Sequence, residues 1–165
     1  MTSSPDMPPP PGLSPAVEDL GLVDALAQLS FLVHSALTEV AGRHDLSVVQ
    51  TRLLGILRDR KPTMNQLGRH LCLDKSSISG LVDRAQRRGL VTRTASETDR
   101  RSFQVSITDA GRQLAEQVAA QFAERIEKCA EPLPETDRQL LSRMATRLVT
   151  ADAHLRGIDL RTTPH

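Results

Sequence analysis

Hydroxyl and cationic side chains follow one another between Asp74 and Arg84, and their chemistry suits a nucleic-acid duplex. Asp74 is a helix N-cap residue, placed where its carboxylate also suits the positive end of the helix dipole. In a helix starting at Lys75, the apolar residues 78, 81, 82 and 85 fall on one buried stripe. Short hydroxyl side chains and cations then occupy the exposed face, where they can bond phosphates or base edges. We therefore predict DNA contacts by Lys75, Ser76, Ser77, Ser79, Gly80 and Arg84.

The sequence around this helix predicts its neighbours. Thr63 and Gln66 have capping-box spacing, which starts a short helix from Met64 to about residue 72. Gly89 suits the left-handed position that ends the second helix. Residues 90–94 and 103–107 have strand composition, and the second alternates in period two. Helix, turn, helix and hairpin together predict a winged helix-turn-helix, a DNA-reading geometry.

The tip of the predicted hairpin and the nearby arginines form a basic cluster. Net charge is only +1 over the chain. Between residues 69 and 101, however, there are eight Lys or Arg (69, 75, 84, 87, 88, 93, 100, 101) and only four Asp or Glu (74, 83, 97, 99). Attraction to phosphates is therefore concentrated here. We predict wing contacts from Asp99, Arg100 and Arg101, and backbone contacts from Thr63, Arg87 and Arg88.

Long amphipathic helices flank this region in a chain of 165 residues, a length that suits one domain. Residues 1–14 are proline-rich and predict a disordered arm, and residues 157–165 a polar tail. Residues 15–42 and 109–156 predict long helices, and Ser47 with Gln50 starts another helix before Pro62. Apolar residues cover much of the first helix, so it needs more than one partner, and the second could be another copy of the chain.

In combination, four segments resemble the multiple-antibiotic-resistance regulator (MarR) family: L-C-L-D, S-S-I-S-G-L-V-D-R-A-Q-R-R-G-L-V-T-R, D-R-R and V-S-I-T-D-A-G. The resemblance covers about residues 18–156. It implies a mainly α fold with a small β-hairpin wing, in which residues 47–108 form the winged helix-turn-helix. Residues 15–42 and 109–156 would be the N- and C-terminal dimerisation helices. A two-fold dimer would read an inverted-repeat operator with half-sites roughly 10 to 10.5 base pairs apart.

The resemblance also implies residue roles and a ligand. In that family Asp99 would hold an arginine by a salt bridge, and Arg100 or Arg101 would enter the minor groove. Small lipophilic or phenolic effectors would lodge between the dimer helices and the winged region and release or tune DNA binding by a repressor. Candidate polar lining groups are Ser30, His34 and Arg52.

Several residues also have structural interpretations. The serines of the recognition helix could be the solvated face of a winged helix that mediates protein interaction or dimerisation without reading DNA. The wing could be an exposed charged turn, and Arg87 and Arg88 could compensate the helix dipole. Cys72 is expected to be a small core residue and Cys129 partly exposed; an oxidant-sensing regulator that uses these cysteines is a further alternative.

Other functional classes find no support in the sequence. Scattered histidines offer no zinc ligand set, and no catalytic or cofactor motif is present, so we expect no metal, no cofactor and no enzyme. With no Trp or Tyr and only three Phe, stacking on single strands is disfavoured. Two cysteines, no signal peptide and no apolar run of about 18 residues predict a cytoplasmic protein that has no membrane partner.

Overall fold

The computed structural model describes residues 19–95 and 103–157, and within them the expected mainly α fold with a small hairpin is confirmed. The two strands form one antiparallel sheet. The elements are α1 (Gly21–Gly42), α2 (Val48–Asp59), α3 (Met64–Leu71), α4 (Lys75–Arg87), β1 (Val91–Ala95), β2 (Phe103–Ile107), α5 (Asp109–Ala130) and α6 (Glu135–Leu155). The predicted arm at 1–14 and nearly all of the predicted tail lie outside the described residues.

Side-chain caps start α2, α3 and α5. The first long helix, expected from residue 15, begins only at Gly21 and has no side-chain cap. Both capping boxes form: Ser47 with Gln50 starts α2, and Thr63 with Gln66 starts α3. The Thr108 hydroxyl accepts a bond from a backbone N–H in the first turn of α5. These bonds satisfy donors that no carbonyl of the helix can reach, so these three helices begin at defined residues.

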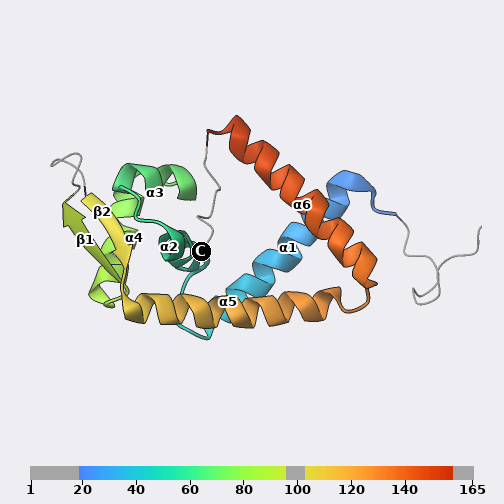
Figure 1. Cartoon of the computed structure of the whole chain (residues 1–165), viewed down its shortest axis with the longest axis horizontal. Helices are drawn as coiled ribbons and strands as arrows, with labels where there is room; N and C mark the ends of the chain where they lie inside the picture. Colours follow the sequence, from blue (N-terminus) through green and yellow to red (C-terminus); the bar gives the residue numbers. More distant parts are fainter. Residues whose placement is uncertain (1–18, 96–102, 158–165) are drawn as a thin grey trace, which may run out of the picture.

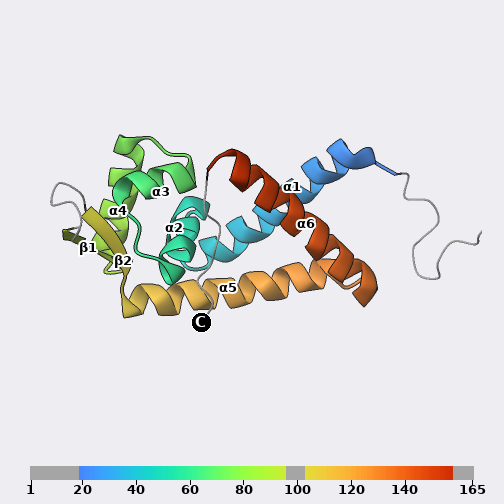
Figure 2. The same ribbon diagram turned by 45° about the horizontal axis from the view of Figure 1, so that its top comes forward.

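The elements divide the molecule into two ends joined by α5, as Figures 1 and 2 show from two angles. At one end α2, α3, α4 and the hairpin form the winged unit, by which we mean residues 47–108. At the other end the N-terminal half of α1 lies near α6, and α5 runs along both ends. An aliphatic core centred on Leu53, Leu54, Leu57, Leu67 and Val82 holds the winged unit together.

The hairpin is tied to the helices on both of its strands. Val91 of β1 faces Ile107 of β2, and both strands place buried residues toward the core. On β2, the Val105 amide donates to the Pro62 carbonyl at 3.0 Å, and Gln104 forms a bridge with Thr63. The base of the wing is therefore fixed beside the start of α3.

The first turn of α5 lies unusually close to the link between α4 and β1. A Cβ at Gly111 would lie 2.1 Å from the Leu90 carbonyl oxygen and 2.9 Å from Ile107. The same carbonyl accepts from the Thr108 amide at 3.0 Å, and the Thr108 hydroxyl donates to the Gly89 carbonyl at 2.7 Å. The T-D-A-G segment therefore joins the winged unit to α5, and position 111 has room for hydrogen only.

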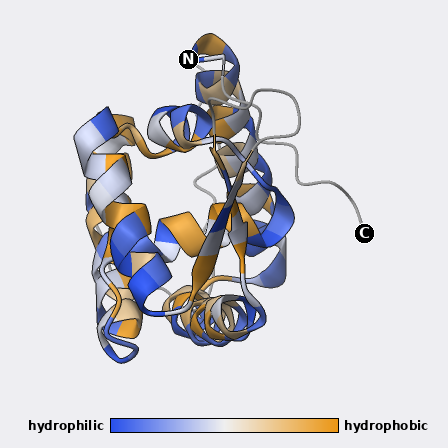
Figure 3. Ribbon diagram, turned by 90° about the vertical axis from the view of Figure 1, so that its left-hand side faces the viewer, coloured by the Kyte–Doolittle hydropathy of each residue, from blue (hydrophilic) through white to orange (hydrophobic). Residues whose placement is uncertain are grey.

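Apolar side chains remain exposed along α1 and α6 of the single chain. Figure 3 shows apolar and polar residues alternating along the helices. The large exposed ones on these two helices are Leu22, Val23, Leu26, Leu29, Phe31, Leu32, Val33, Leu140, Leu141, Met144, Leu148, Val149 and Leu155. Such an extent of apolar surface indicates an interaction site rather than a solvated face.

The expectation that no segment could span a membrane was wrong for α1. By length and composition alone, the helix Gly21–Gly42 is long and apolar enough to cross a membrane, with a mean hydropathy of 1.3 over 18 residues. The expectation rested on the lack of an uninterrupted apolar run, whereas α1 reaches this mean although it includes Asp24 and Glu39. Helices that pack in the core of soluble proteins meet the same criterion, so the finding by itself is weak evidence for a membrane.

We predict that Gly111→Ala lowers the unfolding free energy by about 1–3 kcal/mol, because the methyl group would push α5 away from Leu90. Denaturant unfolding followed by circular dichroism would measure it. Gly55→Ala is the matched control, since a Cβ there meets nothing within 4 Å inside α2 and should leave stability equal or higher. Equal stability of the two variants would contradict the proposed close packing.

Candidate nucleic-acid interface

The N-terminus of α4 is built around Asp74. Its carboxylate accepts from the amides of Ser76 and Ser77 at 2.8 and 2.9 Å, and from their hydroxyls at 2.6 and 2.7 Å. These bonds, those from the two hydroxyls most of all, hold the pKa of the Asp74 carboxyl well below its usual range. The serine hydroxyls thus donate to the cap, and their lone pairs stay available as acceptors.

The predicted contact residues of α4 lie on its outer side. Ile78 and Leu81 are buried as expected. Lys75, Ser76 and Arg84 are exposed, while Ser77, Ser79 and Gly80 are partly buried. A Cβ at Gly80 would lie 3.2 Å from the Arg84 guanidinium, so glycine leaves that side chain room across the helix face.

A cleft of about 290 Å³ lies where α3, α4 and the hairpin meet. It brings together three residues that were predicted as contacts, Thr63 at the start of α3 and Lys75 and Ser79 on α4. Its lining consists of Thr63, Met64, Asn65, Lys75, Ile78, Ser79, Arg93 and Phe103. The Thr63 and Ser79 hydroxyls, the Asn65 amide and the Lys75 ammonium on one concave surface can bond several oxygens of a polyanion at once.

Arg88 has a structural partner. Its guanidinium donates to the Asp45 carbonyl at 2.7 Å and to the His44 carbonyl at 3.2 Å, in the turn between α1 and α2. Asp45 has a positive φ of 53°, so this turn is shaped by a left-handed residue that the arginine holds. Arg87 is exposed in the last turn of α4. Of the two arginines, Arg87 is the better placed to meet a phosphate.

The tip of the wing, with Asp99, Arg100 and Arg101, lies outside the described residues. At the base of the wing, Arg93 has a structural role, whereas from the sequence it counted only as one of the basic residues. Arg93 of β1 forms an ion pair with Asp83 of α4 at 2.5 Å. Period-two alternation could have identified it, because Arg93 shares a strand face with the buried Val91.

Comparison with known proteins agrees with this geometry. A model of the MarR family matches residues 44–102. The homoprotocatechuate degradative operon repressor of Escherichia coli is 30% identical over 105 residues, covering 62% of this chain and 70% of the repressor. The chain belongs to the MarR family. It is therefore a DNA-binding winged-helix transcriptional regulator.

Other relatives extend the similarity along the chain. The regulator PecS of Dickeya dadantii (strain 3937) is 28% identical over 141 residues, covering 81% of this chain and 85% of PecS. A probable transcriptional regulator from Pseudomonas aeruginosa has a crystal structure with a TM-score of 0.65 and 30% identity, covering 79% and 98% of the two chains. The structure of NadR in complex with 4-hydroxyphenylacetate shares the fold, with a TM-score of 0.64 and 20% identity over 82% and 97%.

Ser30, His34 and Arg52, the three residues suggested as ligand contacts, do not line the cavities formed by the described residues of this MarR-family chain. The Ser30 hydroxyl donates within α1 to Ala27, and the His34 carbonyl accepts from the Thr38 hydroxyl of the same helix. Arg52 lies on α2 and reaches the His70 carbonyl of α3 at 3.5 Å. A separate cavity of about 140 Å³ lies between α1, α2 and α5, lined by Leu37, Leu46, Thr51, Leu54, Gly55, Arg58, Ala115, Val118, Ala119 and Phe122.

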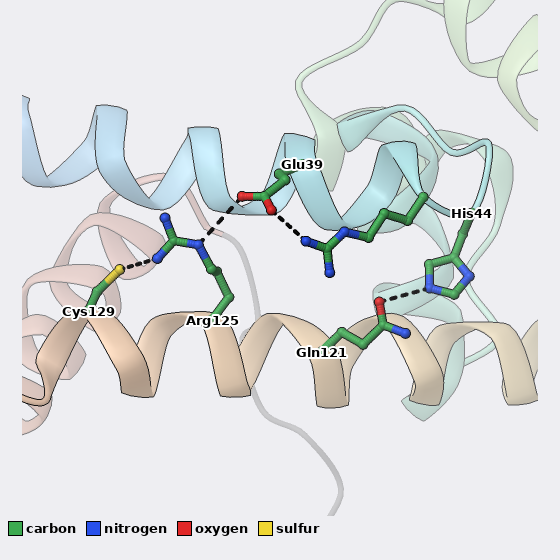
Figure 4. Close-up of polar contacts among 6 residues, drawn as sticks. Glu39, His44, Gln121, Arg125 and Cys129 are labelled. Carbon is green, nitrogen blue, oxygen red and sulfur yellow. Dashed lines mark hydrogen bonds and ion pairs between the residues drawn. The ribbon is translucent and has the colours of Figure 1, made fainter.

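The two cysteines differ from each other in their surroundings. Cys72 is exposed, which corrects our expectation of a core residue: α3 ends at Leu71, and Cys72 adopts a left-handed conformation with φ of 55°. Cys129 is partly buried, as expected, and accepts a bond from Arg125 at 2.5 Å. Figure 4 shows that Arg125 also pairs with Glu39, so α1 and α5 are joined by charge here.

Metal binding has no visible basis in this part of the MarR-family chain. Over residues 19–95 and 103–157, no three His, Cys, Asp or Glu side chains cluster in a way that could hold a metal ion. The polar contacts in Figure 4 instead include a bond within α5, from Arg125 to Cys129, and bonds that join α5 to α1 and to the turn after it, among them His44 with Gln121 at 3.2 Å.

We predict that Asp74 makes the stability of the winged unit sensitive to acid. Because folding lowers its pKa, its contribution is complete above the unfolded pKa of about 4 and is lost as pH falls below that value. Unfolding free energies measured between about pH 5 and pH 2 should fall more steeply for the wild type than for Asp74→Asn. The double variant Ser76→Ala, Ser77→Ala should show a decrease intermediate between those of the wild type and Asp74→Asn. Equal pH dependence of the unfolding free energy in all three proteins would contradict this role of Asp74.

Proposed function

We propose that this MarR-family protein is a homodimeric repressor that binds an inverted-repeat operator and is released or tuned by a small molecule. The observation that supports it most is the combination of a hydroxyl-rich recognition helix and a basic wing with unpartnered apolar helices at the far end. A regulator that works on double-stranded DNA in this way acts in the cytoplasm and needs no catalytic step. The interpretation as a protein-interaction module that does not read DNA is not favoured by family membership.

Dimerisation explains the apolar surface on α1 and α6. Leu29 and Leu32 of α1 and Leu141 and Leu148 of α6 are exposed in one chain. Covering them with a second copy would remove this surface from water without any further partner. A two-fold axis would then set two recognition helices roughly one helical turn of DNA apart, which suits an inverted repeat.

In the proposed complex, α4 enters the major groove and the wing reaches the adjacent minor groove. Lys75 and Arg84 would contact phosphates or guanines, and Ser79 would contact phosphates or base edges. Ser76 and Ser77 donate their hydroxyl hydrogens to Asp74, so they would accept from amino groups at base edges. Gly80 permits close approach, and Thr63 and Arg87 are candidates for the backbone. Asp99 would orient Arg100 or Arg101 for the minor groove.

A small-molecule effector is supported by the cavity between α1, α2 and α5. The cavity is largely apolar with Thr51 and Arg58 on its wall, which suits a lipophilic molecule bearing an anionic or hydroxyl group. Among the relatives, NadR has been crystallised with 4-hydroxyphenylacetate, and the E. coli relative represses an operon for homoprotocatechuate degradation. An effector that changes the spacing of the recognition helices would lower DNA affinity by a coupling free energy of about 1–3 kcal/mol.

We expect Arg100→Ala combined with Arg101→Ala to weaken duplex binding and to flatten its salt dependence. Removing one bond to a phosphate reduces the slope of log K against log salt by about 0.9. Gel-shift or fluorescence titrations at several salt concentrations would measure both quantities. Arg138→Ala, which removes an exposed arginine paired with Glu135 on α6, should leave both unchanged. Unaltered affinity in the wing variant would favour the protein-interaction interpretation.

Glutamates placed on α1 and α6 should convert the dimer into monomers. In Leu32→Glu combined with Leu148→Glu, unpaired charges would be buried in the interface, raising the dimer dissociation constant by about 100-fold or more. Analytical ultracentrifugation measures this constant. Phe103→Glu, at an exposed apolar residue of β2, is the control that should remain dimeric. A monomeric wild type would contradict the proposed dimer.

A further inference from the structure

The side chain of Arg93 lies between the hairpin and the recognition helix. Arg93 is paired in register with Val105, which is fully buried, so its strand face is the one turned to the core. Only 26% of the Arg93 side chain is exposed. An arginine whose purpose was to reach DNA would extend into solvent, whereas this one is directed across α4.

The guanidinium of Arg93 spans one turn of α4. One terminal nitrogen, Nη2, donates to the Asp83 carboxylate at 2.5 Å and to the Ser79 carbonyl at 3.3 Å. These two partners are four residues apart and therefore lie one above the other on the helix. Its Nε is buried and finds no hydrogen-bond partner within the described residues, which shows how closely the side chain is enclosed.

We propose that Arg93 is a positioning residue that holds the wing at a fixed angle to the recognition helix, with Asp83 as its partner. The inference rests on the proposed function, in which α4 and the wing contact one duplex together. On β2 the hairpin is tied to residues 62 and 63 by the Val105 amide and the Gln104 bridge. On β1, Arg93 ties it to α4, so each strand is fastened to a different element.

Two reading elements on one rigid body bind DNA better than two that move independently. If the hairpin could swing, docking α4 in the major groove would leave the wing to be ordered separately, and that ordering reduces affinity. Arg93 itself is already paired with a carboxylate, so it neutralises no phosphate. Its removal should therefore weaken binding without altering the number of counterions released.

The first experiment needs no DNA. Amide hydrogen exchange in the full-length protein should show that Arg93→Ala and Asp83→Ala each lower protection of the β1 and β2 amides by about tenfold, with the α5 amides unchanged. Arg138→Ala, which breaks an ion pair on α6, should leave the hairpin as it is in the wild type. Unchanged hairpin protection, or an equal decrease across all elements, would overturn the proposal.

The second experiment measures duplex affinity against salt for the same variants. Arg93→Ala, Asp83→Ala and the double variant should each raise the Kd by about tenfold and keep the wild-type salt slope. The Kd of the double variant should be no higher than that of the single variant that binds DNA more weakly. A reduced slope for Arg93→Ala would make it a phosphate contact, and unchanged affinity for Asp83→Ala would show that the pair does not position the wing. Either result overturns the proposal. If the wild type bound no duplex, the proposed function would fall, whereas the exchange experiment would still decide whether Arg93 holds the hairpin.

Discussion

The contact between the start of α5 and the end of α4 is the constraint on which the rest of the structure depends. The Leu90 carbonyl lies so near Gly111 that no side chain fits, and Thr108 bonds the backbone on both sides of this contact. Since α5 runs to the opposite end of the molecule, its direction relative to the recognition helix is set here. The close packing at this contact therefore couples the direction of α5 to the position of the winged unit.

The arginines of the winged unit have two kinds of role, and their hydrogen-bond partners distinguish them. Arg88 and Arg93 bond carbonyls and a carboxylate inside the winged unit, so they hold its elements together. Arg84 and Arg87 stay exposed on α4. A count of basic residues between 69 and 101 consequently overstates the charge that a duplex would meet, because some of it is used internally.

The two ends of the molecule present opposite surfaces. Around α4 the outer surface is polar and carries the exposed cations Lys75, Arg84 and Arg87, which suits a hydrated polyanion. Along α1 and α6 it is apolar and unpartnered in one chain, which suits another protein surface. The same apolar surface gives α1 the composition of a membrane-spanning helix, and family membership together with the winged unit makes a partner helix the better explanation.

Local chemistry let the sequence determine the starts of α2, α3, α4 and α5, the hairpin and the family of this protein. Thr63, Asp74 and Thr108 cap helices with side chains a few residues away, and Gly89 ends α4, so each signal is contained in its own segment. Tertiary structure alone decided which long-range partners meet: Arg93 with Asp83, Arg88 with the α1–α2 turn, and Arg52 with the His70 carbonyl of α3. These pairings depend on how helices pack across the core. A one-dimensional pattern shows which face a residue occupies, but not which element lies opposite it.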